Sequence, residues 1–87
     1  MNTVLSMTLT PATCRAARAL LNISQGQLSS LCGVSKRAIS NFEASQTQLI
    51  AANRTMIEGA LEQAGVEFIS ANGGGPGVRL RGPAQST

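Results

Sequence analysis

The sequence lacks the residues on which most enzyme and metal sites depend. It contains no histidine, tryptophan, tyrosine or aspartate, and only two phenylalanines in 87 residues. Histidine is the commonest general base and metal ligand, so its absence argues against both kinds of site. Two cysteines alone do not complete a four-ligand zinc site. We therefore expect no enzyme activity, no cofactor, no metal and no small-molecule ligand.

Cysteine is scarce and long apolar runs are missing. Cys14 and Cys32 fit no CxxC pattern, and a secreted domain of this size would usually carry more cysteines. No stretch reaches the roughly 20 apolar residues of a membrane span. Residues 1–9 have neither a basic residue nor the apolar run of a signal peptide. These absences predict a cytoplasmic protein with reduced cysteines and no membrane contact.

The charge that is present is unevenly placed along a chain long enough for one small domain. Residues 1–42 carry four basic and no acidic side chains, whereas residues 43–87 carry three basic and four acidic ones. A basic excess confined to one half favours an anionic partner that contacts that half.

Capping signals predict four helices, over residues 11–21, 25–32, 36–44 and 50–64. Thr10 before a proline begins the first helix, which ends at Asn22. Ser24 and Gln27 form a capping box for the second helix, and Gly33 ends it. Ser35 caps the third helix, and Gly65 is the expected C-cap of the fourth.

Apolar residues at helical spacing give the expected inward faces. These residues are Ala16, Ala17, Leu20 and Leu21, then Leu28, Leu31 and Cys32, then Ala38, Ile39 and Phe42, and finally Met56, Ile57, Ala60, Leu61 and Ala64. The helical phase leaves Cys14 open between core and surface. Gly59, inside the fourth helix, leaves room for close packing there.

Beyond Gly65 the apolar period changes from 3.6 to 2. Residues 66–69 and 78–81 alternate, and the run 72–77 between them is a strong turn signal. An isolated hairpin is barely stable in water, so this one must pack on the helices or on a second chain. Glu67 and Arg79 are expected to pair on one face. The opposite, apolar face is expected to help make a homodimer, and its residues are Val66, Phe68, Val78 and Leu80.

The spacing from Gln25 to Glu43 is a helix-turn-helix pattern. It reads Gln25-x-x-Leu28-x-x-x-x-Gly33-Val34-Ser35-x-x-x-Ile39-Ser40-x-x-Glu43. A short helix ends at a glycine that reverses the chain, a small apolar residue fills the turn, and a hydroxyl caps the next helix. The N-terminus of that helix points toward phosphate, and its outward residues can enter the major groove of DNA.

With these residues the sequence resembles the Cro/CI-type, XRE-like family of bacterial and phage repressors. The resemblance extends to the runs 14–25 and 60–68 and covers roughly residues 9–81. It implies a mainly α, lambda-repressor-like four-helix DNA-binding domain over 9–65. A short C-terminal β element over 66–82 would serve dimerisation, with flexible tails at 1–8 and 83–87.

The resemblance also implies roles for individual residues. The third helix would read bases, because Arg or Lys can donate to guanine and Asn can pair with adenine. The expected DNA contacts are Gln25, Ser35, Lys36, Arg37, Ser40, Asn41, Thr47 and Gln48. Arg18 and Glu43 are expected to form a partly buried ion pair between the first helix and the end of the third. The loop after Glu43 has no basic residue, so it cannot neutralise the charge of a DNA phosphate.

Two functions of different classes remain open. The first is a transcriptional regulator, a dimeric repressor that binds a palindromic operator in double-stranded DNA. The second is a protein-binding module of the same fold, an antitoxin or antiactivator that docks through the apolar strands. DNA binding weakens steeply with salt, whereas apolar docking does not.

The glycine-rich run 73–77 is no phosphate loop, because no Lys-Ser/Thr pair follows it.

Overall fold

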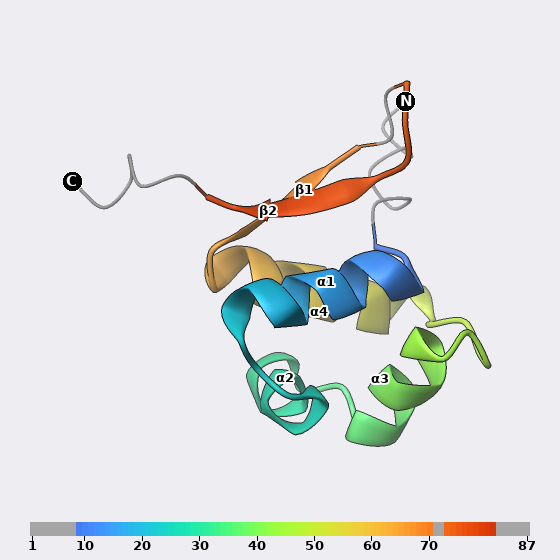
Figure 1. The fold of residues 1–87 in the computed structure, drawn as a ribbon. Coiled ribbons are helices and arrows are strands. Elements are labelled where there is room, and N and C mark those ends of the chain that lie inside the picture. Colours follow the sequence, from blue (N-terminus) through green and yellow to red (C-terminus); the bar gives the residue numbers. More distant parts are fainter. Residues whose placement is uncertain (1–8, 71–72, 82–87) are drawn as a thin grey trace.

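The chain forms four helices followed by a two-stranded hairpin (Figure 1). The elements are α1 (Pro11–Leu21), α2 (Gln25–Cys32), α3 (Lys36–Glu43), α4 (Ala51–Gln63), β1 (Val66–Ile69) and β2 (Gly77–Leu80). The computed structural model describes residues 9–70 and 73–81. The two expected tails, the first residue of the expected turn and residue 82 lie outside them. The predicted mainly α fold with a short C-terminal β element is confirmed.

Local capping decides where the first two helices begin and end. The Thr10 hydroxyl accepts the N–H of Thr13 at 3.0 Å, and the Ser24 hydroxyl accepts the N–H of Gln27 at 3.0 Å. In both helices the third residue returns a hydrogen bond to the backbone of the cap, which completes a capping box. Asn22 and Gly33 end the helices in the left-handed region, with φ of 59° and 80°.

The C-terminus of α3 is a Schellman motif, one residue earlier than expected. The N–H of Ser45 donates to the carbonyl of Phe42 at 2.9 Å, and the N–H of Gln46 donates to that of Asn41 at 2.8 Å. Ser45 takes the left-handed conformation, φ 62°, which glycine usually fills. The motif reverses the chain and sets the direction of the loop over residues 44–50.

One core joins the helices and the hairpin. Leu28, Ile39, Ile57, Leu61 and Val66 have no exposed surface. Cys14, which the sequence left open, is also fully buried. Leu21, Ile23 and Ala38 are partly buried against this core.

Several residues expected inside are exposed instead. On α2, Leu28 and Cys32 lie one turn apart and take the inner face, which leaves Leu31 about 80° to one side and 57% exposed. On α1 the inner face is Thr13, Cys14 and Ala17, because the arginine side of the helix faces α3. The other residues expected inside but found exposed are Ala16, Leu20, Met56 and Ala64.

Two details of α4 differ from expectation. The helix covers Ala51–Gln63, so Ala64 is its C-cap and Gly65 follows with φ 115°. Apart from its chain neighbours and the backbone of its own helix, no described atom lies within 4 Å of the place where Gly59 would carry a Cβ, so no other element packs closely there. In the described ranges, no helix has the length and apolar character needed to cross a membrane.

The hairpin lies across α1 and α4 and so covers one side of the core (Figure 1). Its strands are antiparallel, and β2 begins and ends one residue earlier than expected. Glu67 stands opposite Arg79, and their side chains form an ion pair at 3.2 Å.

The apolar face of the hairpin turns inward rather than toward a second chain. Val66 is fully buried, and Phe68 and Val78 pack against the core of the same chain. Helices of the same chain thus cover Val66 and part of Phe68 and Val78, and the expected homodimer contact through this face stays a prediction. Leu80 is the exception, with 47% of its surface exposed.

Glu58 of α4 has one buried oxygen atom, Oε2, without a hydrogen-bond partner among residues 9–70 and 73–81. Burial raises the pKa of Glu58, and Glu62 adds to the rise while Arg54 opposes it. A raised pKa means that the folded chain binds the proton more tightly than the unfolded chain does. The contribution of Glu58 to stability therefore falls as the pH rises from its ordinary pKa through the raised one.

We expect Glu58→Gln to raise the melting temperature at pH 7, because the amide has no charge to desolvate. The gain should shrink below pH 4, where wild-type Glu58 is protonated in both states. Circular dichroism melting at pH 7 and pH 3.5 measures both effects. Glu62→Gln, at an exposed position of the same helix, removes only the smaller effect of that charge on Glu58 and should therefore raise the melting temperature less. Equal melting temperatures of Glu58→Gln and the wild type at pH 7 would contradict the argument.

Candidate nucleic-acid interface

A three-residue turn over residues 33–35 holds α2 and α3 at a fixed angle. Val34 is buried in this turn, and the Ser29 hydroxyl donates to its carbonyl at 2.7 Å. Leu28 and Ile39 pack beneath the two helices in the shared core. Ser35 caps α3 by accepting the N–H of Ala38 at 3.1 Å. The N-terminus of α3 is therefore held at the surface, with its outward residues free of the core.

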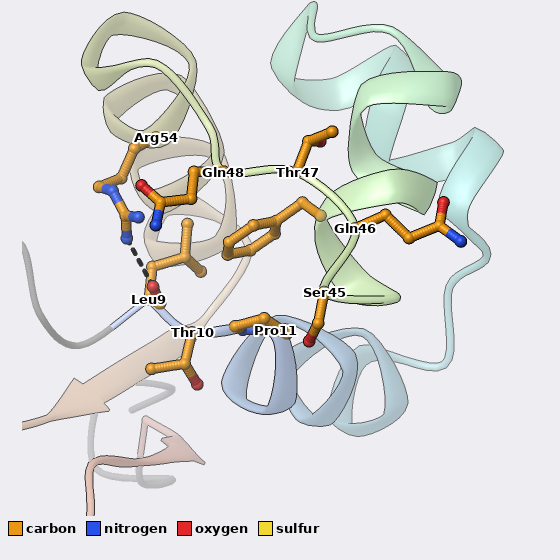
Figure 2. A pocket seen from close by; sticks show the side chains of 9 residues that line it. Leu9, Thr10, Pro11, Ser45, Gln46, Thr47, Gln48 and Arg54 are labelled. Atoms are coloured by element: carbon orange, nitrogen blue, oxygen red, sulfur yellow. Dashed lines mark hydrogen bonds between the residues drawn. The ribbon is translucent and has the colours of Figure 1, made fainter.

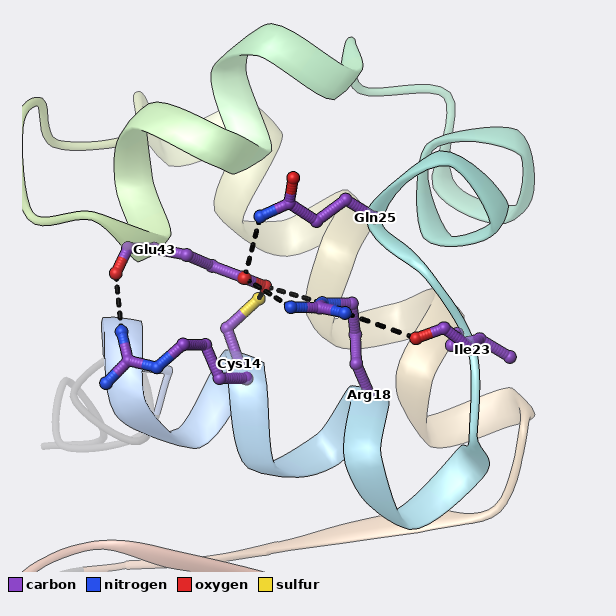
Figure 3. Close-up of polar contacts among 6 residues, drawn as sticks. Cys14, Arg18, Ile23, Gln25 and Glu43 are labelled. Carbon is purple, nitrogen blue, oxygen red and sulfur yellow. Dashed lines mark hydrogen bonds and ion pairs between the residues drawn. The ribbon is translucent and has the colours of Figure 1, made fainter.

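The carboxylate of Glu43, the last residue of α3, binds side chains from α1 and α2 (Figure 3). Arg18 donates from Nη2 to Oε1 at 2.6 Å and from Nε to Oε2 at 2.8 Å. Gln25, the first residue of α2, donates from Nε2 to Oε1 at 3.0 Å. The thiol of Cys14 donates to Oε2 at 3.1 Å. We call these four residues the Glu43 cluster.

Two further bonds join the backbone to this cluster. Arg15 donates to the carbonyl of Glu43, and Nη1 of Arg18 donates to the carbonyl of Ile23 at 3.2 Å. Ile23 lies in the segment that leads into α2. Helix α1 thus fixes the entry of α2 and the end of α3 relative to each other.

The cluster keeps Glu43 ionised although its side chain is only 3% exposed. Burial alone raises the pKa of Glu43, but hydrogen bonds from Arg18, Gln25 and Cys14 and the charge of Arg18 outweigh it. The net pKa lies below its ordinary value. Burial and the bond to Glu43 raise the pKa of the Cys14 thiol, so Cys14 stays a neutral donor.

The predicted DNA-contact residues of α3 lie on one outward side. Lys36 and Arg37 are exposed, whereas Ser40 and Asn41 are half-buried. Ser35 is exposed at the cap, and Thr47 and Gln48 are exposed in the loop after α3. The structure thus brings a basic helix N-terminus and a polar loop to the surface.

Gln25 has a contact that the sequence did not predict. Its amide nitrogen faces Glu43, and its amide oxygen points away from the cluster (Figure 3). Cys14 and Arg15 were also missed as partners of Glu43. A signal existed for Cys14, because it lies four residues before Arg18 and therefore on the same side of α1.

Helix α4 begins without a side-chain cap. Ile50 occupies the N-cap position, makes no capping hydrogen bond, and is 65% exposed. No acidic residue lies in the first turn. The first N–H groups of α4 therefore offer partial positive charge beside the loop that carries Thr47 and Gln48.

A groove of about 650 Å³ lies between this loop and the start of α1 (Figure 2). Arg54 crosses it, donates to the carbonyl of Leu9 at 2.5 Å, and lies 5.8 Å from the centre of the Phe42 ring. Gln46 and Gln48 both belong to its lining, but their amides point to opposite sides of the loop (Figure 2). Within the described part of the chain, no three acidic or cysteine side chains gather to hold a metal ion.

Comparison with known proteins gives this surface its context. Residues 15–49 match the family model described as Helix-turn-helix. This segment belongs to the Cro/CI-type helix-turn-helix family. The matched range includes α2, the turn, α3 and most of α1. The match supports a DNA-binding regulator of the XRE type. No curated protein matches it.

We expect Glu43→Ala to lower the free energy of unfolding by about 3–5 kcal/mol, because it leaves the Arg18 charge partly buried without its partner. The lowered pKa of Glu43 means that its stabilisation is present above the ordinary pKa and is lost as the pH falls through the lowered one. Urea unfolding at pH 7 and pH 3 measures both effects.

Two further variants keep this test decisive. Glu43→Gln preserves the shape of the side chain and removes the charge, so its deficit should shrink at pH 3. Glu67→Ala breaks an exposed ion pair and should change stability far less. Equal unfolding of Glu43→Ala and the wild type at pH 7 would overturn the argument.

Proposed function

We propose that this chain is a repressor that binds a palindromic operator as a dimer and acts mainly by occluding the promoter. The observation that carries the proposal is the exposed Lys36–Arg37 pair at the start of a helix whose far end is fixed by the Glu43 cluster. A rigid helix with a basic, outward N-terminal end is suited to the major groove.

Contacts with DNA divide into those that read bases and those that position the protein. We assign base contacts to Lys36, Arg37, Ser40 and Asn41, which share the outward side of α3. We assign backbone contacts to Gln25, Ser35, Thr47 and Gln48. The uncapped N-terminus of α4 supports the loop contacts, because its N–H groups favour a phosphate beside them.

A dimer would place two copies of α3 about 34 Å apart, one helical turn of DNA. The inward packing of Val66 limits the surface that is available for it. We place the contact at the exposed part of this same face, at Leu80, with half-buried Phe68 and Val78 beside it and Val66 supporting them from the core.

A protein-binding module of the same fold, an antitoxin or antiactivator, is the second candidate. It is favoured by large apolar side chains that are exposed on three helices or their caps. These residues are Leu20, Leu31, Ile50 and Met56. Binding that does not change with salt would favour this candidate.

We expect wild-type protein to select a motif from randomised duplex DNA and to bind it with strong salt dependence. Each phosphate contact contributes a slope of about −0.9 in log affinity against log salt. Lys36→Ala/Arg37→Ala should abolish the binding in fluorescence anisotropy. Arg79→Ala/Arg81→Ala removes the same charge from the hairpin and should retain sequence preference. Equal loss in both double variants would mean that net charge alone drives binding.

We expect Ile50→Asp to raise stability and lower DNA affinity at once. Asp at an N-cap stabilises a helix by about 0.5–2 kcal/mol, but its charge would repel a phosphate at the same place. Ile50→Asn supplies a neutral cap, so it should raise stability and weaken binding less. Thermal melting and anisotropy measure the two effects. Equal DNA affinities of Ile50→Asp and Ile50→Asn would show that no phosphate of the DNA lies at the N-terminus of α4.

A further inference from the structure

We infer that Gln46 is a further base-reading residue, placed beside the C-terminal end of α3, and that it selects an A·T base pair. The inference rests on the proposed function, because it requires α3 to lie in the major groove. Gln46 lies outside the helix, so helical periodicity alone gives no reason to include it.

The Schellman motif determines where Gln46 lies. Its N–H donates to the carbonyl of Asn41 at 2.8 Å, and Ser45 before it holds the left-handed turn. These two features bring the backbone of Gln46 back against the last turn of α3, next to a residue of the outward side. The position of Gln46 is therefore as well defined as that of a helical residue.

The side chain of Gln46 is exposed and extends from the loop on the side opposite to the amide of Gln48 (Figure 2). Gln48 carries the same amide two residues later, but its amide turns into the groove (Figure 2). The two glutamines thus have the same chemistry and opposite directions. Within α3 the one acidic residue is Glu43, whose side chain is buried, so no acid on this side opposes DNA.

The chemistry of an amide favours adenine. A glutamine or asparagine side chain can donate to N7 and accept from N6 of adenine at once, whereas Arg and Lys suit guanine. Lys36 and Asn41 are five residues apart, a rise of about 7.5 Å along α3. Since base pairs are stacked about 3.4 Å apart, Gln46, whose N–H binds the carbonyl of Asn41, should read an A·T pair about two base pairs from the guanine that Lys36 or Arg37 reads.

The test compares wild-type protein, Gln46→Ala and Gln48→Ala in the same selection from randomised duplexes. We expect the wild type to prefer A·T at this position by about 5- to 150-fold over G·C. Gln48→Ala, which removes an assigned backbone contact, should weaken binding to all sequences alike and keep this preference. Gln46→Ala should lose this preference and keep the guanine preference two base pairs away. Gln46→Glu should shift the preference toward cytosine, whose N4 amino group donates to a carboxylate. Thermal melting of each variant shows that the fold is intact.

The outcomes separate this inference from the function beneath it. An unchanged A·T preference in Gln46→Ala overturns the inference and leaves the DNA-binding function standing. An equal loss of affinity for all sequences also overturns it, because that result assigns Gln46 to the DNA backbone. Failure of the wild-type protein to select any motif overturns the proposed function itself.

Discussion

The buried carboxylate of Glu43 is the constraint on which the rest of the DNA-binding surface depends. A buried charge is stable only when its oxygens accept enough hydrogen bonds, and here the donors come from two other helices. Arg18 and Cys14 belong to α1, and Gln25 opens α2. Because one rigid group must satisfy all three, it fixes how α1, α2 and the end of α3 lie relative to one another. Its contribution is better described as orientation than as stability, since ion pairs of this kind often return little net free energy.

This constraint matters because α3 is short. Eight residues form little more than two turns, and an isolated helix of that length is not stable in water. Its two ends are therefore fastened separately, by Ser35 at the start and by the Glu43 cluster and the Schellman motif at the end. Between these two ends, the outward side chains of α3 lie outside the core, so they can be substituted without unfolding the domain. The Schellman motif also sets the position of the loop after α3, which contains Gln46 and Gln48.

The features that sequence reasoning predicted are those that depend on near neighbours. The capping boxes at Thr10 and Ser24 and the left-handed glycine at Gly33 act within a few residues, so the boundaries of α1 and α2 agree closely. Faces of short helices were harder, because in two turns Leu28, Leu31 and Cys32 fit an inward stripe about equally well, and packing chose between them. Alternation along β1 and β2 distinguished the two faces of the hairpin but not which of them the helices would cover. The bonds from Cys14 and Gln25 to Glu43 join residues far apart in the chain, and no local pattern encodes them.

Most of the basic side chains of this chain make hydrogen bonds within the fold. Five of its seven basic side chains hold contacts inside the protein, namely Arg15, Arg18, Arg54, Arg79 and Arg81. The guanidinium groups keep their charge in these contacts, but they are held in place, and the net charge of the chain is only +3. Random DNA should hold such a protein weakly and release it quickly, since non-specific affinity comes almost entirely from free cations. Fewer molecules would then be sequestered along the chromosome, and a small cellular supply would suffice to keep one site filled.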